Sequence, residues 1–142
     1  MIRYLLDSNI VSEPVRPRPD PRVQARLAEH GSRVALASVV WHELLYGMER
    51  LPEGRRKAFL RDYLADVVRP SAPVLPFDDA AAEWLARERA RLDALGQPRP
   101  MLDGQIAAVA ATRGLILVTR NTDDFDGYAG LHVENWFSGG SD

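Results

Sequence analysis

With 142 residues and a hydrophobic fraction of 46%, the chain is long enough for one compact domain with a core of its own. It has no cysteine, which excludes disulfides, thiolate metal sites and a cysteine nucleophile, and which is compatible with a reducing cytoplasm. A formal net charge of −2 argues against a basic protein that coats nucleic acid, and no apolar run approaches the roughly 20 residues of a membrane span.

Short apolar runs alternate with amphipathic stretches along the whole chain. Runs typical of buried strands cover residues 3–6, 34–37, 74–75, 115–118 and 131–133. Helical spacing or capping signals cover residues 10–13, 21–30, 38–47, 55–68, 80–95 and 101–111. The alternation predicts an α/β fold of three layers, with a central, mostly parallel sheet covered by helices on both faces. We expect a single cytoplasmic domain over residues 1–142, in which residues 138–142 form a flexible tail.

Capping residues and charged faces refine this prediction. Asp20 before Pro21 is typical of an N-cap followed by the first helical position. Ser38 is expected to cap the next helix, and Asp78 or Asp79 to cap the helix over 80–95. Two charged clusters are expected to face water, namely Arg55, Arg56, Lys57, Arg61 and Asp62 on one helix and residues 87–91 on another.

Four acidic residues occupy positions that a parallel sheet would bring together. Asp7 follows the first strand, and Asp124 lies just past the strand over 115–118. The carboxyl ends of parallel strands share one edge, where open α/β sheets bind ligands. Glu43 lies on the helix after the second strand, and Asp103 opens the alanine-rich helix, whose dipole favours its charge. Neutral groups placed to orient the acids or bound water are Ser8, Asn9, Thr119 and Asn121.

Carboxylates gathered in this way repel one another, and a hard divalent cation removes the conflict. Mg²⁺ and Mn²⁺ prefer oxygen ligands and keep several waters, so a few carboxylates suffice. Each acid also has a simpler explanation when taken alone. Asp103 is a suitable helix cap, Asp124 a suitable turn residue, and Glu43 a suitable partner for an arginine.

The four acids and their neighbours resemble the motifs of PIN-domain ribonucleases, and most of all the VapC and FitB-like toxins of bacterial toxin–antitoxin pairs. The matching stretches are residues 4–9, Glu43, residues 103–110, and residues 119–125 with the pattern Thr-x-Asn-x-x-Asp-Phe. The resemblance implies a metal-dependent endoribonuclease with catalytic Asp7, Glu43, Asp103 and Asp124, of which Asp7 and Asp103 hold Mg²⁺ or Mn²⁺. It also implies an RNA substrate, a cognate antitoxin that is a small DNA-binding protein, and a toxin homodimer or a larger assembly with the antitoxin.

Several alternatives stay open at the level of sequence. Asn121, Asp123 and Asp126 compete with Asp124 for the fourth acidic position. A haloacid-dehalogenase-like phosphatase would need an acid where Asn9 stands, and a receiver domain would need a lysine after a late strand. A PIN-like scaffold that binds a partner without cutting RNA is the remaining alternative.

Arginines near the acids are candidates for holding the RNA backbone. Arg16, Arg99 and Arg120 are each close in sequence to one of the acids, so we expect them at the rim of the same edge. Arg120 has a competing interpretation, an internal pair with Asp123 or Asp124. The helix faces over 39–46 and 59–64 are expected either to bind the antitoxin in a groove or to belong to the core.

Overall fold

The strands form one parallel sheet of five, in the order β3-β2-β1-β4-β5, in a computed structural model that describes residues 1–138. The strands are β1 (Tyr4–Leu6), β2 (Val34–Ala37), β3 (Val74–Leu75), β4 (Ile116–Val118) and β5 (His132–Glu134). Every pairing is parallel, and β1 is the central strand, with Leu5 opposite Ala35 on one side and Leu117 on the other. The predicted, mostly parallel sheet is confirmed, and the first strand pairs directly with the strand after the alanine-rich helix.

The strand order creates a switch point at the carboxyl end of β1. From β1 the chain builds outward to β2 and β3, and it then returns to add β4 and β5 on the other side of β1. Connections that leave in opposite directions open a crevice between β1 and β4, which is where doubly wound sheets bind ligands. Asp7 and Thr119, the first residues after β1 and β4, therefore lie at this crevice.

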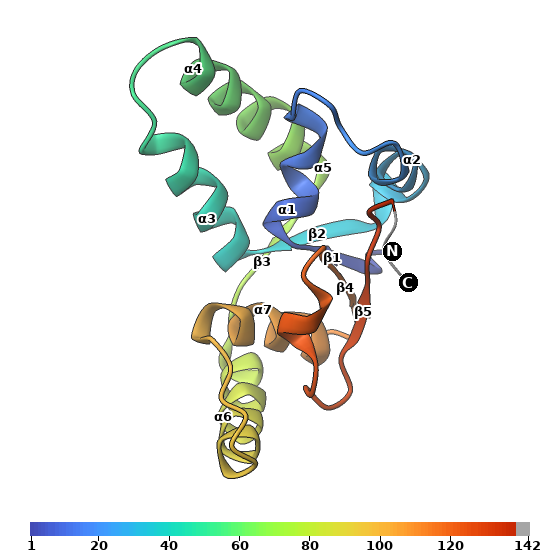
Figure 1. The fold of residues 1–142 in the computed structure, drawn as a ribbon, viewed down its shortest axis with the longest axis vertical. Coiled ribbons are helices and arrows are strands. Elements are labelled where there is room, and N and C mark those ends of the chain that lie inside the picture. Colours follow the sequence, from blue (N-terminus) through green and yellow to red (C-terminus); the bar gives the residue numbers. More distant parts are fainter. Residues whose placement is uncertain (139–142) are drawn as a thin grey trace.

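Helices cover both faces of the sheet, as the sequence predicted. In Figure 1, α6 and α7 lie below the sheet, and α1, α2 and α5 lie above it. The α-helices are α1 (Ser8–Val11), α2 (Pro21–His30), α3 (Ser38–Glu49), α4 (Arg55–Asp62), α5 (Arg69–Ser71), α6 (Asp79–Ala94) and α7 (Met101–Thr112). Shorter turns are the 3₁₀ segments η1 (Glu13–Val15), η2 (Gly31–Arg33) and η4 (Thr122–Phe125), and the π-helical η3 (Tyr63–Val68).

The core is made by the strands and by the small residues of α7. Leu5, Ala35 and Leu117 are fully buried, as is the run from Ala107 to Val109 in α7. Gly104 lets α6 approach closely, because a Cβ at this position would lie 2.8 Å from Leu85 Cδ1. The alanine-rich helix α7 therefore packs closely on its neighbours through side chains of one or no carbon.

The α3–α4 hairpin is held by two polar side chains. Lys57 is buried, and its Nζ donates to the Glu49 carbonyl at the end of α3 and to Glu53 Oε1, at 3.0 and 2.8 Å. The hydroxyl of Tyr63 donates to the Val11 carbonyl at 2.6 Å and so ties η3 to α1. Burial raises the pKa of the Tyr63 hydroxyl to about 12, so it stays a donor over the whole physiological range.

Four local predictions were wrong for identifiable reasons. Ser38 is the first residue of α3 rather than its cap, since Ala37 occupies the N-cap position. Pro70 and Pro73 in the sequence predict a loop over 70–73, but Pro70 continues the helical segment, because the π-turn of η3 leads directly into α5. Lys57 and Glu88 are buried rather than solvated, since each satisfies backbone groups of a neighbouring segment.

The other capping predictions agree with the structure. Asp20 accepts from the backbone N–H groups of Arg22 and Val23, and Asp78 accepts from that of Ala81. Ser138 donates to the Asp20 carboxylate through its N–H and its hydroxyl. Residues 139–142 of the predicted tail lie outside the described part of the chain.

Candidate active site

Asp7 is a buried carboxylate held by three donors at the switch point. It caps α1, and its Oδ1 accepts from the Ser8 backbone N–H at 2.8 Å. Its Oδ2 accepts from the Thr119 hydroxyl at 2.8 Å and, at 3.5 Å, from the Asn9 side chain. Burial raises the pKa of Asp7 and the nearby Asp124 raises it further, while the bonds from Thr119 and Ser8 act in the opposite direction.

The neutral residues predicted to support the acids form one network around Thr119. The Thr119 side chain is fully buried, and its hydroxyl accepts from Asn9 Nδ2 at 3.4 Å and from the Asn121 backbone N–H at 3.1 Å. Asn9 Oδ1 in turn accepts from the Arg120 backbone N–H at 3.1 Å. The segment after β4 is thereby fixed to the segment after β1, and Asp7 is held in one orientation.

Glu43 and Asp103 approach the crevice from two different helices. Burial is the main cause that raises the pKa of each, and the second cause is repulsion from other acids. Repulsion from Asp7 and Asp103 raises the pKa of Glu43, and His42 lowers it in part. Asp103 is repelled by Asp124 and Asp7. The structure thus gathers the acids closely enough that their neighbours raise the pKa values of Asp7, Glu43 and Asp103.

Asp124 is the acid of its loop that faces this cluster. It raises the pKa of both Asp7 and Asp103, whereas Asp123 and Asp126 do neither. The turn η4 explains the selection, because the Asp124 N–H donates to the Asn121 carbonyl and the buried Phe125 anchors the turn in the core. Asp124 itself is exposed, so it lies at the mouth of the crevice, with Asp7 at its floor.

The donor set has the chemistry of a site for a hard cation. All four acids offer oxygen, and none forms a salt bridge with a basic residue in the part of the chain that is described. Within residues 1–138, no group of three or more His, Cys, Asp or Glu side chains is placed as a ready-made metal site. Mg²⁺ and Mn²⁺ need fewer protein ligands than that, because they retain several waters between themselves and the protein.

The loop that carries Asp124 is fastened by a buried glutamate that sequence reasoning missed. Glu88 on α6 accepts from the Ala129 N–H at 2.7 Å and from Arg91 Nε and Nη2 at 2.9 and 2.8 Å. Arg91 also donates to the Gly127 carbonyl. The signal available in the sequence was a lone acid among arginines, Arg87-Glu88-Arg89, which is equally typical of a solvated helix face.

Tyr128 is a second residue beside the acids that the sequence did not reveal. It is buried, its ring packs at a tilt against the ring of Trp84, and its hydroxyl lies 3.2 Å from where a Cβ of Gly104 would be. Burial is the main cause that raises its pKa, and the Asp103 carboxylate adds to the effect. The Tyr128 hydroxyl therefore remains protonated next to the start of α7.

The predicted rim arginines lie on different sides of the crevice. Arg16 and Arg120 line one cleft together with Arg18. Arg99 lies elsewhere, where its Nη1 donates to the Asp123 carbonyl at 3.3 Å and helps to hold the η4 turn. Among the described residues no ion pair joins Arg120 to Asp123 or Asp124, and its guanidinium lies over the Phe137 ring instead.

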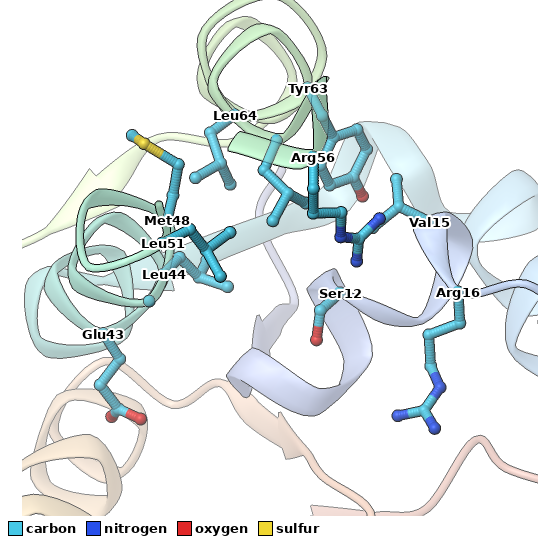
Figure 2. Close-up of a pocket in the computed structure, with 12 residues that line it drawn as sticks. Ser12, Val15, Arg16, Glu43, Leu44, Met48, Leu51, Arg56, Tyr63 and Leu64 are labelled. Carbon is cyan, nitrogen blue, oxygen red and sulfur yellow. The ribbon is translucent and has the colours of Figure 1, made fainter. Parts of the chain in front are cut away.

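An apolar groove opens beside Glu43. It has a volume of about 340 Å³ and lies between α3, α4 and the α1–η1 segment. In Figure 2, Leu44, Met48 and Leu51 line one wall and Tyr63 lies across from them, while the Glu43 side chain points away from the leucines. Arg16 and Arg56 also reach this groove. Exposed Tyr46 and Phe59, at 58% and 51%, show that these helix faces are only partly core.

Comparison with known proteins agrees with this architecture. A profile of the PIN domain family matches residues 4–131. The chain belongs to the PIN domain family. It is 34% identical over 138 residues to the tRNA(fMet)-specific endonuclease VapC of Shigella flexneri, covering 96% of this chain and 99% of that protein. It is 36% identical over 124 residues to Toxin FitB of Neisseria gonorrhoeae, covering 85% of this chain and 89% of that protein.

Solved structures show the same PIN fold. One chain in the crystal structure of DNA-bound VapBC from Salmonella typhimurium superposes with a TM-score of 0.80 at 29% identity, over 96% of this chain and 99% of that one. The predicted resemblance and the predicted three-layer fold are thereby confirmed. No helix within residues 1–138 has the length and apolar character needed to cross a membrane.

Proposed function

We propose that this PIN-domain chain is a metal-dependent endoribonuclease that acts as the toxin of a toxin–antitoxin pair. The observation that carries the proposal is the gathering of Asp7, Glu43, Asp103 and Asp124 at the switch point without a basic partner among the described residues. Groups with raised pKa values in a crevice are typical of functional sites. The ribonuclease and toxin names of the relatives support the same conclusion.

Each acid has a role that follows from its place in the crevice. Asp7 and Asp103 are the carboxylates that would hold Mg²⁺ or Mn²⁺, because Asp7 is fixed by hydrogen bonds and Asp103 lies in the first turn of α7. Glu43 and Asp124 would hold and deprotonate the ion's water ligands. A bound ion supplies an activated water and offsets negative charge at the phosphorus.

The neutral residues prepare the site before RNA binds. Thr119 and the Ser8 N–H fix the Asp7 carboxylate, so no side-chain freedom is lost when the substrate arrives. Asn9 couples Asp7 to the backbone of Arg120, and Asn121 donates its N–H to Thr119. These groups orient the acids, and we assign them no direct contact with the reacting phosphate. Arg16 and Arg120, and with less structural support Arg99, are assigned to the RNA backbone.

Transfer RNA is the first substrate to test, because the Shigella relative is named for it. Purified protein is expected to cleave bulk transfer RNA with Mg²⁺ or Mn²⁺ and to stop when EDTA is added. Asp103→Asn should abolish cleavage, while the variant should still fold and unfold in one cooperative thermal transition. Metal-independent cleavage, or full activity of the variant, would contradict the proposal. A folded protein that cuts no RNA but still binds a partner would instead support the scaffold alternative.

A partner protein fits the apolar groove beside Glu43. A helix that lays apolar side chains against Leu44 and Leu60 would place a basic residue near Glu43 and the other acids, where it would compete with the metal. The DNA-bound VapBC relative supports a partner that binds DNA, and we expect a toxin homodimer that assembles further with it.

A negative charge introduced into the apolar groove tests this partner. Leu44→Glu should lower affinity for the cognate antitoxin, which is expected to be a small DNA-binding protein, and Ala58→Glu on the exposed side of α4 is the matched control. The expected result is loss of growth rescue by the small protein for Leu44→Glu only. Equal rescue of both variants would place the partner on another surface.

A further inference from the structure

A cleft lined by arginines begins directly beside the Asp7 network. It has a volume of about 450 Å³, and we call it the arginine cleft; its lining includes Glu13, Arg16, Arg18, Asp20, Arg120 and Phe137. A short chain of hydrogen bonds connects it to the acids. The Arg120 N–H donates to Asn9, whose amide group donates to Asp7, so the cleft and the crevice share one wall.

Two of its arginines are held ready to bind an anion. The Arg120 guanidinium carbon lies 4.7 Å from the centre of the Phe137 ring, which is itself 5% exposed and therefore fixed in the core. Arg18 stands between Pro17 and Pro19, whose rings restrict the backbone on both sides. Both arginines are exposed, and within residues 1–138 neither has a hydrogen bond or ion pair from its side chain.

The two carboxylates of the cleft do not neutralise these charges, because each is already used. Glu13 accepts from the Asp20 N–H at 2.8 Å and pairs with Arg16 at 3.7 Å. Asp20 caps α2 through two N–H groups and accepts from Ser138 as well. Among the described residues, Arg18 and Arg120 are thus the cleft arginines whose charge no carboxylate of the cleft offsets.

From this arrangement we propose that the arginine cleft binds the phosphodiester backbone of the RNA on one side of the cleaved bond. The inference rests on the proposed ribonuclease function and adds the path of the bound RNA. The RNA strand leaves the acids past Asn9 and runs toward the proline-stiffened loop at Arg18. Planar guanidinium groups match phosphate oxygens in geometry and charge. Phe137 is covered by Arg120, so the cleft contacts backbone rather than stacking bases.

An acidic segment of a partner protein is the competing occupant, and the position of the cleft favours RNA. The apolar groove that fits a helix lies on the other side of Arg16, between α3 and α4. The arginine cleft has little apolar lining beyond prolines and the covered Phe137, so a peptide would gain little hydrophobic burial there. A phosphodiester needs only the charges and donors that the cleft presents.

The test uses a double variant and a control that removes one arginine far from the cleft. Arg18→Ala with Arg120→Ala removes both cleft cations, and Arg33→Ala removes an exposed arginine at the opposite, amino-terminal end of β2. Binding of fluorescently labelled bulk transfer RNA is measured between low and high salt without divalent ions. We expect the double variant to bind at least about tenfold more weakly at low salt. Its plot of log affinity against log salt should be shallower by about 1.4, since each lost contact to single-stranded RNA contributes about 0.7.

Two further measurements distinguish a failure of the cleft inference from a failure of the proposed catalysis or of folding. Mn²⁺ binding by calorimetry should be the same in the double variant and the wild type, whereas failure of the wild type to bind Mn²⁺ would refute the catalytic proposal alone. Arg18→Ala by itself touches no core residue, and we expect it to reduce the salt slope by about 0.7 with an unchanged melting temperature. The cleft inference is overturned if the double variant and Arg33→Ala bind RNA alike. It is also overturned if the double variant loses affinity for the partner protein and keeps it for RNA.

Discussion

Removing the charge of Glu88 should loosen the loop that carries Asp124. Glu88→Gln keeps the shape of the side chain but weakens three hydrogen bonds, those from Ala129 and from two nitrogens of Arg91. Hydrogen bonds to charged groups contribute about 1.5–3 kcal/mol each when buried. The Arg91 side chain is 41% exposed, so solvent screening reduces its share, and we expect a total loss of about 2 kcal/mol. For a chain of this length that corresponds to a melting temperature lowered by about 5–10 °C.

The pKa of Glu88 determines how its contribution to stability changes with pH. The bonds from Arg91, and then the Ala129 N–H, hold the pKa of Glu88 below its usual range. The native state therefore binds fewer protons than the unfolded state, and the stabilisation is present above the unfolded pKa of about 4.3. This stabilisation is lost as the pH falls through the lower pKa that Glu88 has in the native state. The difference in unfolding free energy between Glu88→Gln and the wild type should consequently be largest near neutral pH and disappear in acid.

Thermal melting across pH, together with RNA cleavage, tests the reasoning. Glu83→Gln on the exposed face of the same helix is the control and should melt like the wild type. Because Glu88 acts through the loop, we expect Glu88→Gln to need more Mn²⁺ for half-maximal cleavage. A variant with a lowered melting point and an unchanged Mn²⁺ requirement would show that Glu88 is only structural. An unchanged melting point would refute the argument entirely.

Two other predictions follow from the acids and their support. Asp103→Asn should raise the melting temperature of the metal-free protein. The pKa values of Asp7, Glu43 and Asp103 are raised in the native state, so the native state loses stability as the pH rises through these values. The gain in melting temperature should be larger at pH 8 than at pH 5, and an equal gain at both would contradict the prediction. Thr119→Val removes the 2.8 Å hydrogen bond to Asp7 and leaves the Asn121 N–H without its acceptor, which should cost about 1–3 kcal/mol of stability. We also expect a lower kcat for RNA cleavage with little change in RNA affinity. A variant that loses affinity and keeps kcat would place Thr119 in substrate binding.

The parts of the fold that the sequence predicted depend on local signals. Apolar runs followed by Asp7 or by Thr119 marked strands that end at one edge, and the alternation of strands and helices required that edge to be shared. The Asp20-Pro21 pair marked a helix start because capping needs only backbone groups two and three residues ahead.

The parts that the sequence missed depend on contacts between distant segments. Lys57 and Glu88 look like surface charges until the backbone groups that they bind, at Glu49 and Ala129, are in place. The choice among Asp123, Asp124 and Asp126 is invisible in composition, since only the η4 turn decides which carboxylate faces Asp7. Phe137 could not be assigned to Arg120 without the return of the chain after β5.

The central claim is that the gathered carboxylates hold a divalent ion for RNA hydrolysis, and one titration tests it most directly. Cleavage of bulk transfer RNA is measured against Mn²⁺ concentration for the wild type, for Asp7→Asn, and for Asp126→Asn as a control in the same region of the sheet edge. We predict saturable, Mn²⁺-dependent cleavage by the wild type and by Asp126→Asn, and none by Asp7→Asn at any concentration. Equal cleavage by Asp7→Asn and the wild type would contradict the account.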